Sequence, residues 1–92
     1  MQNKIRYGGR EIGVGDEFTA HFQFLPSKAT YISRSDEGII IFPESGCRMV
    51  PEMLMGRWKI VEARVRLVKL HETGNGKLVA IVKPIEWEGI YK

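Results

Sequence analysis

Residues 57–87, RWKIVEARVRLVKLHETGNGKLVAIVKPIEW, carry the longest β signal in the chain. Two runs rich in Val and Ile, 57–72 and 76–87, flank the turn sequence Gly74-Asn75-Gly76. Glycine and asparagine tolerate a positive φ, so the chain can reverse there and the two runs can pair as a hairpin. Apolar residues fill both faces of the second run from 78 to 82, which is typical of a central strand covered on two sides. We expect the rest of the chain to pack around this strand.

A helical alternative exists for the first run of this hairpin. Apolar residues recur at intervals of 4, 3, 4 and 3 from Leu54 to Val68, and Glu62 and Arg66 would form a favourable helical pair. However, Gly56 would interrupt the helix, and the run is rich in β-branched residues, which are stiff in helices and fit strands. The strand is therefore the favoured interpretation.

As a strand, this run has two faces of different character. The apolar face consists of Val61, Ala63, Val65 and Leu67, and the polar face consists of Glu62, Arg64 and Arg66. Trp58 and Ile60 are out of phase with the apolar face, which predicts a β-bulge near 60–61. Strands that bend in this way allow a small sheet to curl closed.

Strand signals recur along the rest of the chain. The clearest alternation lies at 17–24, and further strands are predicted at 4–7, 30–34, 38–42 and 47–50. Turns are predicted at 26–28, 35–38 and 43–46, and the glycine-broken stretch 10–15 is predicted to be a loop or an irregular edge. The stretch 51–56 begins with Pro and ends with Gly, which suits a short helical turn near 52–55.

These signals predict an all-β fold. The expected architecture is a small, partly open antiparallel β-barrel of five or six strands, Src-homology-3-like or OB-like, with one short helical turn. A chain of 92 residues is expected to form a single β-barrel domain, 1–92. Its predicted core consists of Phe18, Ala20, Phe22, Phe24, Ile39, Ile41, Val61, Val65, Leu67, Val79 and Ile81.

Composition points to a soluble protein. A hydrophobic content of 43% with 27% charged residues is ordinary for a globular domain and argues against disorder. The longest apolar runs are far shorter than the roughly 20 residues that span a bilayer, and the first residues lead into no signal-peptide core. The single cysteine, Cys47, fits a reducing compartment. We therefore expect a cytoplasmic protein with no membrane partner.

The positive charge is concentrated in one part of the chain. Residues 1–47 carry 5 basic and 6 acidic residues, a net charge of −1, and residues 84–92 also sum to −1. Residues 48–83 carry 8 basic and 3 acidic residues, a net charge of +5. This asymmetry favours an anionic partner, although an ordinary solvated sheet face would look similar.

The sequence carries no catalytic motif. It has two histidines and one cysteine, and it lacks the nucleophile-elbow, zinc-protease and phosphate-loop patterns. His21 and His71 lie in no arrangement that supplies a nucleophile or a metal site. We expect no enzymatic activity, no catalytic residues, no bound metal and no cofactor.

A basic hairpin face is the main functional candidate. Cations that follow nucleic-acid phosphates, beside aromatic rings that stack on bases, are the platform of small strand-binding barrels. We predict that this face contacts nucleic acid, a nucleoprotein or an acidic protein surface through Arg48, Arg57, Lys59, Arg64, Arg66 and Lys69. Tyr7, Tyr31 and Trp58 are the rings available for stacking, although Trp58 also fits a place in the core.

A protein-directed function is the alternative. Near the expected helical turn lies an apolar cluster, and flexible thioethers suit an adaptable contact patch. The predicted protein-contact patch consists of Met53, Leu54 and Met55. A small stand-alone inhibitor or adaptor, such as a phage-type anti-defence or regulatory protein that blocks a bacterial enzyme, would show this lack of catalytic chemistry. The same cluster would also plug a barrel end, and both a monomer and a homodimer remain open.

Two short motifs resemble those of PilZ domains, β-barrels that bind cyclic di-GMP. The stretch 6–10, RYGGR, has the RxxxR spacing, and 33–38, SRSDEG, is similar to the [DN]xSxxG motif, with Ser33 departing from the pattern. The resemblance implies that Arg6 and Arg10 would clamp guanine and phosphate, while Ser35 and Gly38 would contact the other base. Bidentate arginines suit such a ligand. Cyclic di-GMP binding is a third hypothesis.

Overall fold

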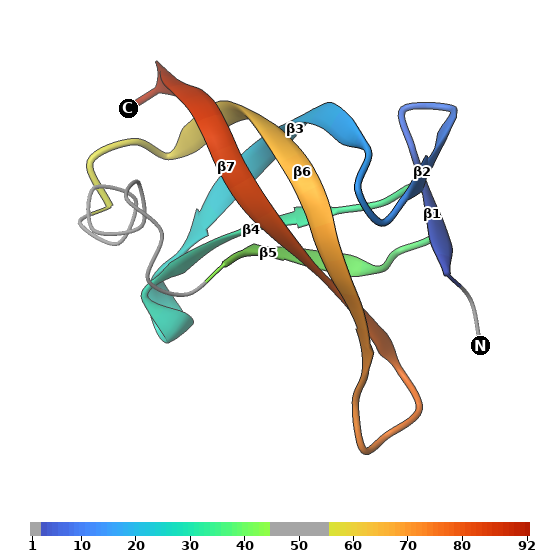
Figure 1. Ribbon diagram of the computed structural model, residues 1–92. Coiled ribbons are helices and arrows are strands. Elements are labelled where there is room, and N and C mark those ends of the chain that lie inside the picture. Colours follow the sequence, from blue (N-terminus) through green and yellow to red (C-terminus); the bar gives the residue numbers. More distant parts are fainter. Residues whose placement is uncertain (1–2, 45–55) are drawn as a thin grey trace.

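The computed structural model describes residues 3–44 and 56–92, which are mainly β-strand (Figure 1). The strands are β1 (Lys4–Tyr7), β2 (Arg10–Gly13), β3 (Glu17–Leu25), β4 (Thr30–Arg34), β5 (Ile40–Pro43), β6 (Ile60–Glu72) and β7 (Leu78–Tyr91). Within the described ranges, one 3₁₀ turn, η1 (Pro26–Lys28), joins β3 to β4 at a predicted turn. The predicted all-β class and small-barrel architecture are confirmed.

Five strands close into a barrel in the order β3-β4-β5-β7-β6, with β6 pairing back onto β3. β5 and β7 are parallel, whereas the other neighbouring strands are antiparallel. This order, in which the third barrel strand lies beside the fifth, is that of an OB-like Greek-key barrel, one of the two expected types. The barrel is closed and mixed, whereas the sequence predicted it to be partly open and antiparallel.

Closure depends on the two longest strands. β6 and β7 span 13 and 14 residues, and their pairing shifts register between Ile60 and Val61, between Arg64 and Val65, and between Leu67 and Lys69. The first shift confirms the predicted bulge. Bulges increase the twist and coiling of a strand, so β6 reaches β3 while β7 reaches β5. The parallel contact joins segments far apart in sequence, and local turn signals carry no information about it.

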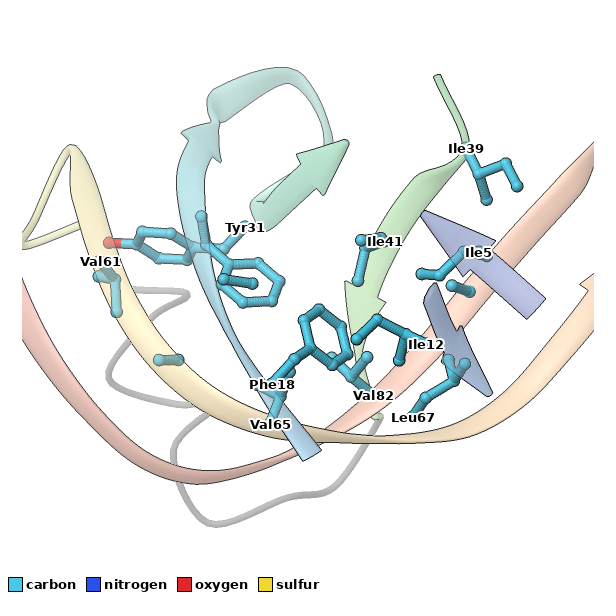
Figure 2. Close-up of a cluster of buried hydrophobic side chains, with 14 residues drawn as sticks. Ile5, Ile12, Phe18, Tyr31, Ile39, Ile41, Val61, Val65, Leu67 and Val82 are labelled. Atoms are coloured by element: carbon cyan, nitrogen blue, oxygen red, sulfur yellow. The ribbon is translucent and has the colours of Figure 1, made fainter. Parts of the chain in front are cut away.

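Most of the predicted core is buried, and Figure 2 shows many of these side chains meeting inside the barrel. The confirmed members are Phe18, Ala20, Phe22, Ile39, Ile41, Val61, Val65 and Leu67. Phe24 was also predicted to be core but is only half-buried, and the centre of its ring lies 5.2 Å from the centre of the Tyr31 ring. Tyr31 itself is fully buried.

The set of β7 side chains that faces the core differs from the prediction. Ala80 and Val82 are fully buried, whereas Val79 and Ile81, which were predicted to be core, lie half-buried on the outer surface. The register shift between Arg64 and Val65 sets this phase, because the pairing that follows it places the buried Leu67 opposite Val82. A one-residue change of phase moves every side chain to the other face. β7 therefore has one face in the core and an apolar outer face.

The stretch predicted as a loop at 10–15 contains a strand. β2 pairs with β1 in a two-stranded sheet separate from the barrel, through a Gly8-Gly9 turn with φ values of 59° and 80°. Two positive φ angles in succession define the turn that matches strand twist, and glycine adopts them without strain. Figure 2 shows Ile5 and Ile12 of this hairpin beside the barrel core, and both are almost completely buried.

Several expectations lie outside the described residues. These are the strand at 47–50, the second half of the turn at 43–46 and the helical turn near 52–55. Among the described residues, no helix has the length and apolar character required to cross a membrane.

Candidate nucleic-acid interface

Two of the predicted binding arginines share one carboxylate. Arg64 Nη2 lies 2.8 Å from Glu17 Oε1, and Arg66 Nη2 lies 2.7 Å from Glu17 Oε2. The pairing of β3 with β6 explains this geometry, because Glu17 stands directly opposite Arg66 on the outer surface. The hydrogen bond from Arg66 and the positive charge of Arg64 lower the pKa of Glu17 below its ordinary value. Glu17 therefore neutralises part of the charge that the sequence assigned to ligand binding.

Further carboxylates stand beside these arginines. Glu62 lies 3.0 Å from His21 Nε2, and on the neighbouring strand Glu88 is opposite Glu62 and Glu86 is opposite Arg64. We call the outward residues of this region the charged face: Glu17, His21, Glu62, Arg64, Arg66, Glu86 and Glu88. Its carboxylates outnumber its arginines, so it is a mixed surface and not a uniformly basic one.

The other predicted cations lie elsewhere. Lys59 Nζ lies 5.7 Å from the centre of the Tyr91 ring, near the end of β7, and Arg57 is exposed just before it. Lys69 is opposite Ile81, farther along the hairpin. Arg48 lies outside the described residues, as do Met53, Leu54 and Met55 of the protein-contact patch. The described members of the predicted site thus fall into three separate places, and their binding role stays a prediction.

The rings expected to stack on bases have structural roles. Tyr31 is fully buried, its hydroxyl donates a hydrogen bond to the Trp58 carbonyl, and burial raises its pKa above the ordinary value. The Tyr7 hydroxyl lies 3.0 Å from Ser33 Oγ and accepts a hydrogen bond from the His21 amide at 2.9 Å. Tyr31 is therefore inaccessible to a ligand, and Tyr7 fastens the N-terminal hairpin to the barrel.

A groove of about 500 Å³ lies on a different side of the barrel. We call it the strand groove, and it is lined by Lys28, Arg34, Glu37, Gly38, Ile39, Ile40, Phe42, Thr73, Asn75, Lys77, Leu78 and Val79. Its residues come from η1, β4, the β4–β5 loop, β5, the β6–β7 turn and the start of β7. Segments distant in sequence therefore form one surface.

The floor of the strand groove follows from strand alternation. Ile41 and Ala80 point into the core, so their neighbours Ile40 and Val79, which face each other across the parallel pair, point outward. Phe42, two residues beyond Ile40, is half-buried on the same outer face. An aromatic ring and two aliphatic side chains thus form an apolar surface between strands.

Three cations surround this apolar floor. Lys28 comes from η1, Arg34 from the end of β4 and Lys77 from the β6–β7 turn. Glu37 is the one acidic residue among the described residues that line the groove, which gives these residues a net charge of +2. Among the described residues, none of these three cations has a carboxylate within ion-pair distance. Their charges remain available to an anion.

Sequence reasoning did not identify this groove. The available signal was the run 39–42, IIIF, which has apolar side chains on both faces, together with apolar residues on both faces of β7. Once both strands are placed in a barrel with one inner face, half of these side chains must lie outside. Cations in the flanking turns are the other part of the sequence signal for this groove.

The two motifs that resemble those of PilZ domains lie against each other. The Asp36 carboxylate accepts hydrogen bonds from the Gly8 amide at 3.0 Å and the Gly9 amide at 2.8 Å. Ser35 is buried, and its hydroxyl accepts a hydrogen bond from the Ile39 amide at 3.0 Å. These contacts give Asp36 and Ser35 a structural role, and the binding of a nucleotide by Arg6, Arg10, Ser35 and Gly38 stays a prediction.

Comparisons with protein-family models, with curated proteins and with solved structures found no significant match.

Proposed function

We propose that this protein is a non-catalytic binding module that holds single-stranded nucleic acid in the strand groove. The observation that carries the proposal is the combination of a half-buried, outward-facing aromatic and aliphatic floor with three cations from separate elements that form no ion pair among the described residues. The cations would contact phosphates, and the Phe42 ring would stack on a base. Base stacking of this kind tolerates many sequences, because every base has a π-face.

The position of the strand groove in the barrel supports this proposal. OB-like barrels bind oligonucleotides on the face of their second and third strands, between the loops that join strands one to two and four to five. In this chain, β4 and β5 are the second and third barrel strands, and η1 and the β6–β7 turn are the two loops. Lys28, Lys77 and Phe42 lie on these elements.

The cations of the β6–β7 hairpin would contribute less to the binding of nucleic acid than those of the strand groove. Arg64 and Arg66 are paired with Glu17, so a phosphate would have to compete with an existing carboxylate. Lys69 is exposed, and it would add long-range attraction without lining the strand groove. The proposed setting is the cytoplasm, where a protein with one cysteine would remain reduced.

The test is a fluorescence-anisotropy titration with a labelled oligothymidine and with a duplex of equal length, at about 50 mM and about 200 mM salt. The proposal predicts tighter binding of the single strand and an affinity that falls as salt rises, because phosphate contacts release counterions. Equal or tighter binding of the duplex, or no binding of either at low salt, would contradict it.

A protein-directed inhibitor or adaptor remains the second candidate, supported by a different observation. Ile85, Ile90 and Tyr91 of β7 are 43%, 51% and 59% exposed, which places three large apolar side chains on the outer surface. Apolar contacts weaken little with salt. Salt-insensitive binding to a protein partner, abolished by Ile90→Asp and unaffected by Arg34→Ala, would favour this candidate over nucleic-acid binding.

A further inference from the structure

We propose that the N-terminal β1–β2 hairpin controls the strand groove through the loop that joins β4 to β5, so that docking of the hairpin and binding of nucleic acid are thermodynamically coupled. This inference rests on the proposed function. It concerns a segment that lines no part of the strand groove itself.

The first observation is that one loop serves both sites. Glu37, Gly38 and Ile39 line the strand groove, while Asp36 and Glu37 hold the hairpin. The loop also connects β4 to β5, the two strands beneath the groove. A change in its position would therefore change the groove wall.

The second observation is the set of hydrogen bonds that holds the hairpin. The Gly8 and Gly9 amides donate to the two carboxylate oxygens of Asp36, at 3.0 and 2.8 Å. The Arg6 amide donates to Glu37 Oε1 at 3.0 Å, and the Asp36 amide donates to the Arg6 carbonyl at 2.7 Å. We call these four bonds the clasp. Two adjacent amides binding one carboxylate form a small anion site, which the chain fills with its own Asp36.

The third observation is that the loop is internally braced. The Ser35 amide donates to the Ile39 carbonyl at 2.9 Å, and the Gly38 amide donates to the Ser35 carbonyl at 2.9 Å. The buried Ser35 hydroxyl accepts from Ile39, and Gly38 has a φ of 81°, which favours glycine. A loop fixed by so many internal bonds moves as a unit, so the clasp at Asp36 also positions Gly38 and Ile39.

The fourth observation concerns Glu37. Its Oε1 accepts the Arg6 amide, which holds this carboxylate toward the hairpin. Without the hairpin, the carboxylate would be able to turn toward the cations of the strand groove, of which Arg34 is close to it in sequence. The docked hairpin therefore favours a groove that is open to an anion, and the undocked hairpin favours one that is partly neutralised by the chain itself.

The coupling makes a prediction opposite to that of simple electrostatics. Asp36→Ala removes a negative charge near the strand groove, which by charge alone would strengthen the binding of an anion. If the clasp controls the groove, the same change weakens binding by about fivefold or more, the usual lower range for coupled sites. Glu88→Ala removes an equal charge from the charged face and is the matched control.

The experiment titrates labelled oligothymidine with wild type, Asp36→Ala and Glu88→Ala, after tryptophan fluorescence has shown each variant to be folded. Weaker binding by Asp36→Ala alone supports the coupling. Equal or tighter binding by Asp36→Ala overturns the coupling and leaves the proposed function standing. No binding by wild type overturns both.

A second measurement covers the case in which Asp36→Ala does not fold. Hydrogen exchange of the wild-type Gly8 and Gly9 amides is followed with and without oligothymidine. Coupling is reciprocal, so the oligonucleotide should slow the exchange of these amides, although they lie outside the strand groove. Unchanged exchange at saturating oligonucleotide would overturn the inference.

Discussion

The indole ring of Trp58 occupies the space that a side chain at Gly89 would need. A Cβ atom built on Gly89 would lie 1.9 Å from Trp58 Cδ2 and 2.2 Å from Cε2. Trp58 precedes β6, Gly89 lies near the end of β7, and the Lys59 amide donates to the Tyr91 carbonyl beside them. The contact between Trp58 and Gly89 packs one end of the β6–β7 hairpin, which consists of the two longest strands of the barrel.

Gly89→Ala is expected to destabilise the protein because the methyl group would collide with a large ring. Overpacking a well-packed site costs about 1 to 3 kcal/mol, so we expect a loss of about 2 kcal/mol in a urea denaturation experiment. Gly74→Ala is the matched control, because a Cβ there meets nothing within 4 Å. Equal midpoints for the two variants would show that Trp58 does not pack on Gly89.

The ion pairs of Glu17 predict a pH dependence of stability. Because Arg66 and Arg64 lower its pKa from the ordinary 4.5, the stabilisation is present above pH 4.5 and is lost as the pH falls through the lowered value. The difference in urea midpoint between wild type and Glu17→Gln should therefore be largest near neutral pH and shrink in acid. Glu72→Gln, with no ion pair among the described residues, is the control. A difference that does not change with pH would contradict the ion-pair interpretation.

The buried Tyr31 hydroxyl predicts loss of stability in alkali. Burial raises its pKa from 10.0, so the folded state keeps the proton that the unfolded state releases. Stability is therefore full below pH 10.0 and falls as the pH rises toward the raised value. Tyr31→Phe should cost about 1 to 3 kcal/mol near neutral pH, since the Trp58 carbonyl loses its donor, and should flatten the alkaline loss. The exposed Tyr91, changed to Phe, should alter neither quantity.

Because Phe42 lies on the outer surface of the barrel, we expect changes to its ring to affect the binding of nucleic acid more than the stability of the fold. Phe42→Ala should weaken the binding of oligothymidine about tenfold, because stacking of one base is worth about 1 to 3 kcal/mol. Phe42→Tyr keeps an aromatic ring at this position and should bind oligothymidine with an affinity close to that of the wild type. Anisotropy titrations of both variants check this, and an unchanged affinity for Phe42→Ala would remove the proposed stacking contact.

Much of the fold could be predicted from the local alternation of apolar and polar residues and from the turn sequences. The alternation around Phe18, Ala20 and Phe22 predicted β3, the proline at 26 predicted the turn after it, and the phase change at Ile60 predicted the bulge. These features depend on neighbours in sequence, so the sequence alone reveals them.

Features that depend on distant contacts were not predictable in the same way. The buried phase of β7 is set by a register shift between Arg64 and Val65, and both phases of 78–82 are equally apolar in sequence. The pairing of β5 with β7 placed Ile40 and Val79 on one outer surface with Lys28 and Lys77. Charge counting along the chain identified Arg64 and Arg66 but could not show that Glu17 stands opposite Arg66.

The most direct test compares two double variants that remove equal charge. Arg34→Ala/Lys77→Ala alters the strand groove, and Arg64→Ala/Arg66→Ala alters the charged face. Both are titrated with labelled oligothymidine across a range of salt concentrations. We predict that the strand-groove variant binds more weakly, with the slope of log affinity against log salt reduced by about two, while the charged-face variant stays close to wild type. Loss of binding in the charged-face variant with the strand-groove variant unchanged would contradict the proposed site.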